Sequence, residues 1–96
     1  MKFEKEEYGK FVIYNIIEKE LIGSIEFIEK ENFIENIYLY PKYRGKGYLT
    51  KIVKFLSDKY GKLYCLPLRE HVEKFKHLGF IFWKSEGSDK YYQRIL

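Results

Sequence analysis

The sequence predicts a small mixed α/β (α+β) domain, with two helices, a mostly antiparallel sheet and the element order βββαβαββ. Three observations lead to this class. β-Branched and aromatic residues fill the first 40 positions in short runs divided by charged turns. From Lys46 onward, the apolar spacing changes to that of a helix. Because 96 residues are too few for two separate cores, we expect residues 1–96 to form a single domain.

The first part of the chain is expected to form a meander of three strands. These strands are predicted over residues 8–18, 21–29 and 33–40, and charged residues at 19 and 20 form the first turn. Alternation is clearest in the second strand, where one face is predicted to hold Leu21, Gly23, Ile25 and Phe27.

The remainder of the chain is expected to form two helices and three strands. The spacing i, i+3, i+4, i+7 predicts a first amphipathic helix that ends at Gly61, and its apolar positions are Leu49, Ile52, Val53, Leu56 and Tyr60. A strand follows over 62–66. A second helix over 69–78, ended by Gly79, is expected to turn Val72, Phe75 and Leu78 inward. The last strands are expected over 80–83 and 90–96, joined by a turn over 85–89.

Composition excludes several classes of protein. Eighteen Lys and Arg against 14 Asp and Glu give a net charge of +4, spread along the chain, so a nucleic-acid module is supported by composition alone and is disfavoured. One cysteine and two histidines cannot complete an ordinary zinc site, so we expect no metal. No targeting segment or apolar run of roughly 20 residues is visible, which predicts no membrane span and a cytoplasmic location.

The most informative stretch is residues 34–50, IENIYLYPKYRGKGYLT, where a strand passes through a short basic loop into a helix. Backbone amides at a helix N-terminus lack internal partners and bind anions. Gly45 and Gly47 would let such an anion approach, and Arg44 and Lys46 add positive charge. The spacing is neither that of a nucleotide-triphosphate loop nor that of a dinucleotide fingerprint, so an ordinary basic turn explains the glycines equally well.

This stretch resembles the GNAT superfamily of N-acetyltransferases. The family's pyrophosphate motif is Arg or Gln, two residues, Gly, one residue, then Gly or Ala; it falls on Arg44, Gly45, Lys46, Gly47, Tyr48 and Leu49. A second landmark, an aromatic residue four before a Gly-Phe pair, falls on Phe75, Gly79 and Phe80. The chain is similar to a minimal, phage-type member that lacks the first strand and the two helices usually found before residue 8.

The resemblance implies an acetyl-CoA-dependent N-acetyltransferase that uses direct attack in a ternary complex. The acceptor would be a primary amine, either a protein lysine or a small molecule, and acetyl-CoA would be the co-substrate. By the same resemblance, the pantetheine arm would be contacted by Ile37, Tyr38 and Leu39, and the Leu39 N–H would polarise the thioester carbonyl. The pyrophosphate would be held by Arg44, Gly45, Lys46, Gly47, Tyr48, Leu49 and Thr50.

Direct transfer requires a neutral amine, and deprotonating a lysine amine at pH 7 costs about 4 to 5 kcal/mol. Glu35 and His71 are the candidate catalytic residues. The family's best-known glutamate base would fall on Phe33, so Glu35 is offset by two positions and stays on the same face of a strand. A solvated strand glutamate and a surface histidine are the alternative interpretations.

Three departures from the family pattern support a second reading. Phe75 stands where the family usually has a tyrosine acid, Leu68 replaces a cofactor-binding asparagine, and Leu49 replaces a small residue. The alternative is therefore a catalytically degenerate domain that binds acetyl-CoA or a protein partner without turnover. The sequence leaves the acceptor open, and a homodimer is one way to supply the missing wall of its site.

Overall fold

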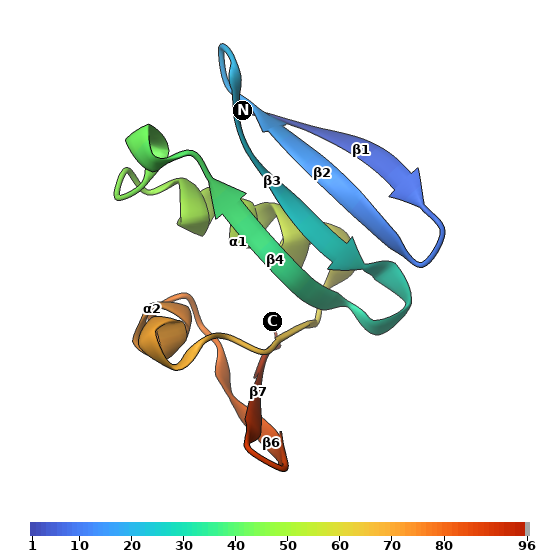
Figure 1. Ribbon diagram of the computed structural model, residues 1–96, viewed down its shortest axis with the longest axis vertical. Coiled ribbons are helices and arrows are strands. Elements are labelled where there is room, and N and C mark those ends of the chain that lie inside the picture. The colour runs from blue at the N-terminus through green and yellow to red at the C-terminus, as the bar shows by residue number, and fades with distance from the viewer. Residues whose placement is uncertain (96) are drawn as a thin grey trace. The chain divides into compact units, whose positions relative to one another are not determined.

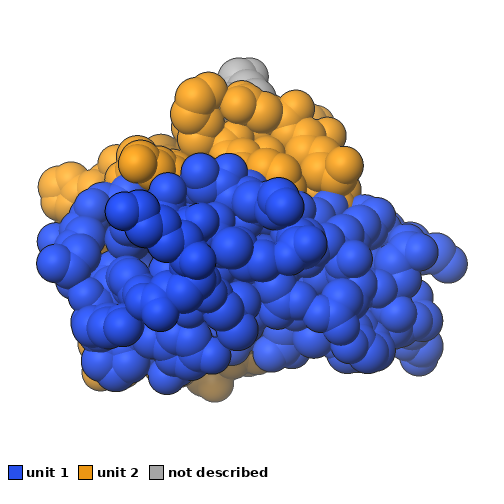
Figure 2. Space-filling view, turned by 90° about the horizontal axis from the view of Figure 1, so that it is seen from above, with its two compact units in different colours: residues 1–48 blue, residues 49–96 orange. Residues whose placement is uncertain are grey.

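The computed structural model describes residues 1–95. The chain divides into two compact units, residues 1–48 and residues 49–96, which Figure 2 shows in separate colours. Together they contain seven strands and two α-helices, so the predicted mixed α/β class is confirmed. Within the described residues of each unit, the strands pair in antiparallel fashion, as predicted.

Unit 1 is an antiparallel meander of four strands, which Figure 1 shows side by side. In chain order these are β1 (Lys2–Tyr8), β2 (Phe11–Ile17), β3 (Leu21–Ile28) and β4 (Phe33–Leu39). Two short 3-10 turns follow β3 and β4: η1 (Glu29–Glu31) and η2 (Pro41–Tyr43). The predicted bounds of the second, third and fourth of these strands agree with the structure to within a few residues.

Strand β1 was not expected from the sequence. It pairs with β2 along its whole length, from Lys2 opposite Ile17 to Tyr8 opposite Phe11. Its sequence, KFEKEEY, carries charge at most positions and gives no strand signal, yet an edge strand tolerates such charges. The order is therefore ββββαβαββ, and the expectation that the first strand is absent was wrong. A two-residue turn that includes Gly9 (φ 58°) leads directly into β2, so no helix lies between them.

A β-bulge in β3 changes which residues face the interior of unit 1. Ile16 pairs with Gly23 and Ile17 with Leu21, which leaves Ile22 as the extra residue. Ile22 is fully buried, whereas Leu21 is 43% exposed. The prediction that alternate residues of this strand face inward is therefore correct only from Gly23 onward. An inserted residue shifts the alternation of the residues before it to the other face.

Unit 2 contains both α-helices and a small antiparallel sheet. Its elements are α1 (Tyr48–Tyr60), β5 (Leu63–Cys65), η3 (Arg69–His71), α2 (Val72–His77), β6 (Ile81–Glu86) and β7 (Asp89–Arg94). Helix α1 begins at the last residue of unit 1, and strand β7 pairs with both β5 and β6.

The first predicted helix is continuous in the structure, whereas the second is not. Helix α1 ends at Gly61 as predicted, where φ is 79° and the amide donates to the Ser57 carbonyl at 2.8 Å. The second predicted helix is divided into the 3-10 turn η3 and the six-residue helix α2. Its expected inward residues are only half-buried: Val72, Phe75 and Leu78.

Each unit contributes buried apolar side chains. In unit 1 they come from β2, β3 and β4: Val12, Tyr14, Ile16, Ile22, Ile25, Phe27 and Ile34. In unit 2 they are Ile52, Val53, Leu56, Leu63, Cys65, Phe80 and Tyr92. None of the helices in residues 1–95 has the length and apolar character needed to cross a membrane.

Candidate active site

Strand β4 carries a bulge at the candidate base Glu35. Asn36 pairs with Glu26 and Ile34 pairs with Phe27, so Glu35 is the extra residue between them. Glu35 and Asn36 are both exposed, whereas Ile34 is buried. The structure therefore leaves the Glu35 side chain exposed to solvent.

The far end of β4 presents main-chain groups at the edge that β3 does not occupy. The Tyr40 amide donates to the Ile22 carbonyl at 3.0 Å, so the main chain of Tyr40 faces β3. Because successive residues of a strand direct these groups to opposite edges, those of Ile37 and Leu39 point to the other edge. The main chain of Tyr38 faces β3, which leaves its exposed ring as the part that could meet a ligand.

Arg44 folds back onto this end of β4. Its Nε donates a hydrogen bond to the Leu39 carbonyl at 2.8 Å. The guanidinium carbon lies 5.4 Å from the centroid of the Tyr38 ring, and that ring meets Tyr40 edge-on at 5.6 Å. Arg44 therefore fixes the start of the basic loop to the strand, a role that the sequence did not indicate.

The turn η2 is also held by the connection between β2 and β3. Lys42 Nζ lies 3.0 Å from the Glu20 carboxylate, and the Tyr43 hydroxyl donates a hydrogen bond to the same carboxylate. The Tyr43 ring packs edge-on against Tyr48, with centroids 6.1 Å apart. The loop is thus tied to β4 by Arg44 and to the β2–β3 turn by Glu20.

Both glycines of this loop have a left-handed backbone conformation. φ is 73° at Gly45 and 83° at Gly47, in the left-handed region that disfavours side chains. No heavy atom lies within 4 Å of the position that a Cβ would take at either residue. These glycines stand immediately before α1, whose first turn contains Tyr48, Leu49 and Thr50. Exposed Lys46 lies between them, and the half-buried Leu49 fits the apolar stripe.

His71, the second candidate catalytic residue, lies in unit 2. It ends η3 and directly precedes α2, its side chain is 45% exposed, and its Nε2 lies 4.0 Å from the Glu70 carboxylate. The structure does not bring His71 and Glu35 into the same unit.

Phe75 and its Gly-Phe partner form the end of α2. The Phe75 ring meets buried Phe80 edge-on at 5.4 Å, and the Phe80 amide donates to the Phe75 carbonyl at 3.0 Å. Gly79 has φ 96°, and its amide donates to the Lys76 carbonyl at 3.0 Å. The Phe75, Gly79 and Phe80 landmark therefore marks the C-terminal end of α2, where two aromatic rings pack together.

Cys65 is a structural residue. It is 2% exposed, and burial raises the pKa of its thiol to about 12. A thiol with such a pKa holds its proton at neutral pH and is a poor nucleophile. In residues 1–95 no group of three or more His, Cys, Asp or Glu side chains is arranged to hold a metal.

A family model described as the acetyltransferase (GNAT) family matches residues 2–94 of this chain. The chain belongs to the GNAT family. The resemblance predicted from the basic loop and the Phe75 landmark is thereby confirmed. No curated protein matches the sequence.

Solved structures of GNAT enzymes share this fold. PaiA N-acetyltransferase of Thermoplasma acidophilum, solved with coenzyme A, is 22% identical with TM-score 0.65, covering 90% of this chain and 60% of that one. A variant of spermidine N-acetyltransferase SpeG from Vibrio cholerae is 20% identical with TM-score 0.67. The match covers 90% of this chain and 66% of the SpeG chain. The N-acetyltransferase YlbP of Bacillus subtilis, with coenzyme A, is 14% identical with TM-score 0.69, covering 91% and 68%. The chain thus spans about two thirds or less of the length of these proteins.

Two residues near the loop were missed by sequence reasoning. A Cβ on Gly23 would lie 2.1 Å from the Tyr38 carbonyl oxygen, so β3 and β4 approach closely only because this residue is glycine. A glycine inside an apolar strand is a recognisable signal for such an approach. Glu20 gave no signal, because its partner Tyr43 lies 23 residues away.

Proposed function

We propose that residues 1–96 act as a single GNAT domain that transfers the acetyl group of acetyl-CoA to a primary amine. The observation that carries this proposal is the pair of glycines before α1, both at positive φ and both open on the side where a Cβ would lie. The Arg44 amide is bonded to the Pro41 carbonyl at 3.2 Å, so the amides that follow it would bind the diphosphate oxygens, and the helix N-terminus adds a favourable dipole. The residues present therefore fit the coenzyme's diphosphate.

The last residues of β4 support binding of the pantetheine arm. Main-chain groups of Ile37 and Leu39 point to the edge that β3 does not occupy, where an extended amide-containing chain would add as a strand does. The carbonyl of Leu39 accepts a hydrogen bond from Arg44, whereas its amide would donate a hydrogen bond to the thioester carbonyl and polarise it. The two terminal nitrogens of the Arg44 guanidinium can still reach an anion.

The reaction would proceed by direct attack in a ternary complex. The protonated amine loses one proton, the lone pair so freed forms the new N–C bond, and the C–S bond breaks to release the coenzyme as a thiolate. The nitrogen loses a second proton to water as the amide forms. Glu35, exposed on the β4 bulge, would accept the first proton through water. His71 would return a proton to the thiolate, because Phe75 has none to give and its ring is engaged with Phe80.

The amine itself is specified only as a class. The structural neighbour SpeG is a spermidine N-acetyltransferase, which supports testing polyamines beside lysine-containing peptides. A second copy of this chain would complete the acceptor site if residues 1–96 provide too little of its wall. Sedimentation at micromolar concentration, with and without acetyl-CoA, tests this homodimer.

A domain that binds acetyl-CoA or a protein partner without turnover is the second candidate. The observation that favours it is Phe75, which stands in the position of the family's usual tyrosine acid and packs on Phe80. Leu68 adds to this case, since it is 65% exposed and offers the coenzyme no polar group.

Calorimetric titration with acetyl-CoA, followed by a thiol-release assay with spermidine and a lysine peptide, separates these candidates. Micromolar binding with amine-dependent thiol release supports the acetyltransferase. Binding without release from any amine supports the non-catalytic domain. Absence of binding at millimolar acetyl-CoA would contradict the acetyltransferase and the coenzyme-binding form of the second candidate, and would leave only binding of a protein partner.

A further inference from the structure

Helix α2 is too short to hold its own position. It has six residues, none of them buried, and His71 at its start makes no side-chain cap hydrogen bond. A helix of this length is unstable alone in water, so its orientation depends on tertiary ties. His71 nevertheless caps the start of this helix and Phe75 lies within it, and the proposed function assigns His71 the protonation of the thiolate.

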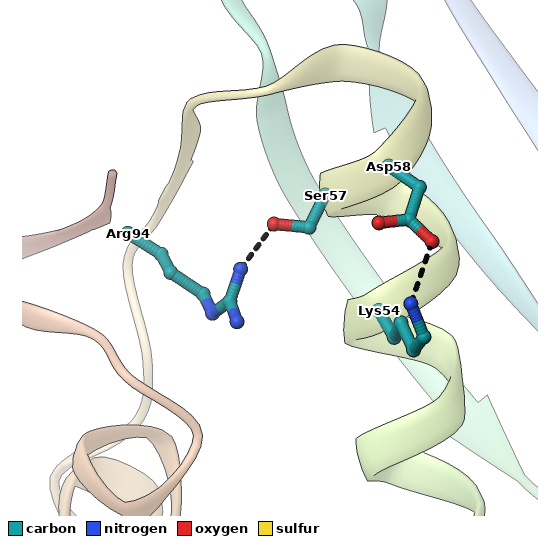
Figure 3. A network of polar contacts seen from close by, with 4 residues as sticks. All are labelled: Lys54, Ser57, Asp58 and Arg94. Carbon is teal, nitrogen blue, oxygen red and sulfur yellow. Dashed lines mark hydrogen bonds and ion pairs between the residues drawn. The ribbon is translucent and has the colours of Figure 1, made fainter. Parts of the chain in front are cut away.

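A single guanidinium supplies such a tie. Arg94 ends β7, and its Nε donates to the carbonyl of Leu78, the residue that caps α2, at 2.8 Å. Its Nη1 donates a hydrogen bond to the Ser57 hydroxyl on α1, as Figure 3 shows. Ser57 is only 2% exposed and is the one buried polar side chain found in residues 1–95. Arg94 therefore joins β7, α1 and the end of α2.

Gly79 makes room for this arrangement. A Cβ at Gly79 would lie 3.0 Å from the Arg94 Nε, tighter than nearly all real contacts, and φ there is 96°. The glycine that ends α2 is therefore also the one that lets the guanidinium reach the Leu78 carbonyl. A hydrogen bond from a charged donor in a partly buried setting is stronger than an exposed ion pair such as Lys54–Asp58, drawn beside it in Figure 3.

We infer that Arg94 is a positioning residue, which holds α2 and so places His71 for the transfer step. This inference rests on the proposed function, because it assigns α2 a part in that reaction. The hydrogen bonds of Arg94 to Leu78 and Ser57 both lie within unit 2, whereas the loop of residues 44–47 belongs to unit 1. Loss of the tie should therefore slow turnover and leave coenzyme affinity unchanged.

The test begins with Arg94→Lys, since lysine keeps the charge and cannot bridge two acceptors in fixed geometry. Hydrogen exchange should become at least about tenfold faster at the Leu78, Gly79 and Phe80 amides, which close the end of α2. Exchange at the Gly61 amide, which reports on α1, should be unchanged. Arg69→Lys makes the same chemical change at an exposed position of η3 and should alter neither amide set.

The catalytic arm compares kcat with coenzyme affinity. In Arg94→Lys, kcat should fall about tenfold and the Kd for acetyl-CoA should stay within about twofold. In a His71→Ala background, the same substitution should have little further effect on kcat, which a general loss of stability would not produce. Ser57→Ala, which removes only the α1 partner, should give a smaller change in the same direction and serves if Arg94→Lys does not fold.

The outcomes distinguish this inference from the proposed function. Unchanged exchange at the end of α2 in both variants would overturn the inference even if the protein is an active acetyltransferase. Equal losses in kcat and coenzyme affinity would also overturn it, since they indicate general unfolding. A wild-type protein without turnover would contradict the proposed function and the catalytic part of this inference together, whereas faster exchange would still establish the structural tie.

Discussion

The ε-nitrogen of Arg44 donates a hydrogen bond to the carbonyl oxygen of Leu39 at 2.8 Å. This bond joins the first residue of the glycine loop to the last residue of β4. Leu39 offers the amide proposed to polarise the thioester, and Arg44 begins the loop proposed to hold the diphosphate. One side chain therefore fixes the spacing between the two halves of the proposed coenzyme site within unit 1.

Arg44→Ala should weaken acetyl-CoA binding more than Lys46→Ala does. Each substitution removes one positive charge from the loop, and only the first also removes the tie to Leu39. A charged hydrogen bond of about 2 kcal/mol corresponds to roughly a thirtyfold rise in Kd. Calorimetry on both variants measures the difference. Equal losses of acetyl-CoA affinity would show that Arg44 contributes only its charge.

Gly47→Asp should lower acetyl-CoA affinity by roughly a hundredfold, because it sets a carboxylate beside the proposed diphosphate. Asparagine has the shape of aspartate without its charge, and both residues tolerate the positive φ of Gly47. Gly47→Asn therefore isolates the electrostatic effect. Gly9→Asp places the charge on a remote turn glycine with φ 58° and should bind normally. If the aspartate and asparagine variants at residue 47 bind alike, the assigned diphosphate site is wrong.

Gly23→Ala should destabilise the protein by roughly 3 kcal/mol, since its Cβ would lie 2.1 Å from the Tyr38 carbonyl oxygen and the strands must part. Gly9→Ala, with open space around it, should cost only about 1 kcal/mol from its positive φ. Urea unfolding of both variants provides the comparison. Similar midpoints for the two would show that β3 and β4 separate at little cost.

The Cys65 thiol should react with a disulfide reagent about a thousandfold more slowly in the folded protein at pH 8 than in denaturant. Burial raises its pKa to about 12, so little thiolate is present. The stabilising contribution of the protonated thiol is complete below the unfolded pKa and is lost as the pH rises toward about 12. Rapid labelling of the native protein at pH 8 would contradict this assignment.

His71→Ala should lower kcat by roughly a hundredfold with little change in the Kd for acetyl-CoA, if His71 moves a proton. Glu35→Gln keeps the size of the side chain and tests the other candidate under the same conditions. Steady-state thiol release across pH 6 to about 9 shows which substitution removes a limb of the profile. Unchanged turnover in both variants would assign the proton transfers to water.

Much of the fold could be predicted because its signals are local. The period of Leu49 to Leu56 and the stop at Gly61 define α1, and alternating apolar residues define β2 to β4. Strand β1 was missed because a charged edge strand is stabilised by pairing with β2 rather than by its own pattern. The bulges at Ile22 and Glu35 were missed because one inserted residue has no sequence mark.

The candidate site was predictable only in part. The motif identified the loop from Arg44 to Thr50, since glycine and charge are visible in a sequence. The ties that hold this loop, from Glu20 and to Leu39, depend on how distant segments meet. The relation between Glu35 and His71 likewise depends on tertiary placement and not on spacing along the chain.

The two-residue turn between β1 and β2 makes this fold a natural recipient for grafted segments. Neighbouring strands lie about 4.8 Å apart, so an insert at Gly9 would keep the pairing intact if its own ends meet at that distance. A helical hairpin, whose two axes lie about 8–10 Å apart, satisfies this condition when a short linker joins each of its ends to a strand. Chimeras carrying such hairpins would show whether the inserted segment changes which amine the proposed transferase accepts.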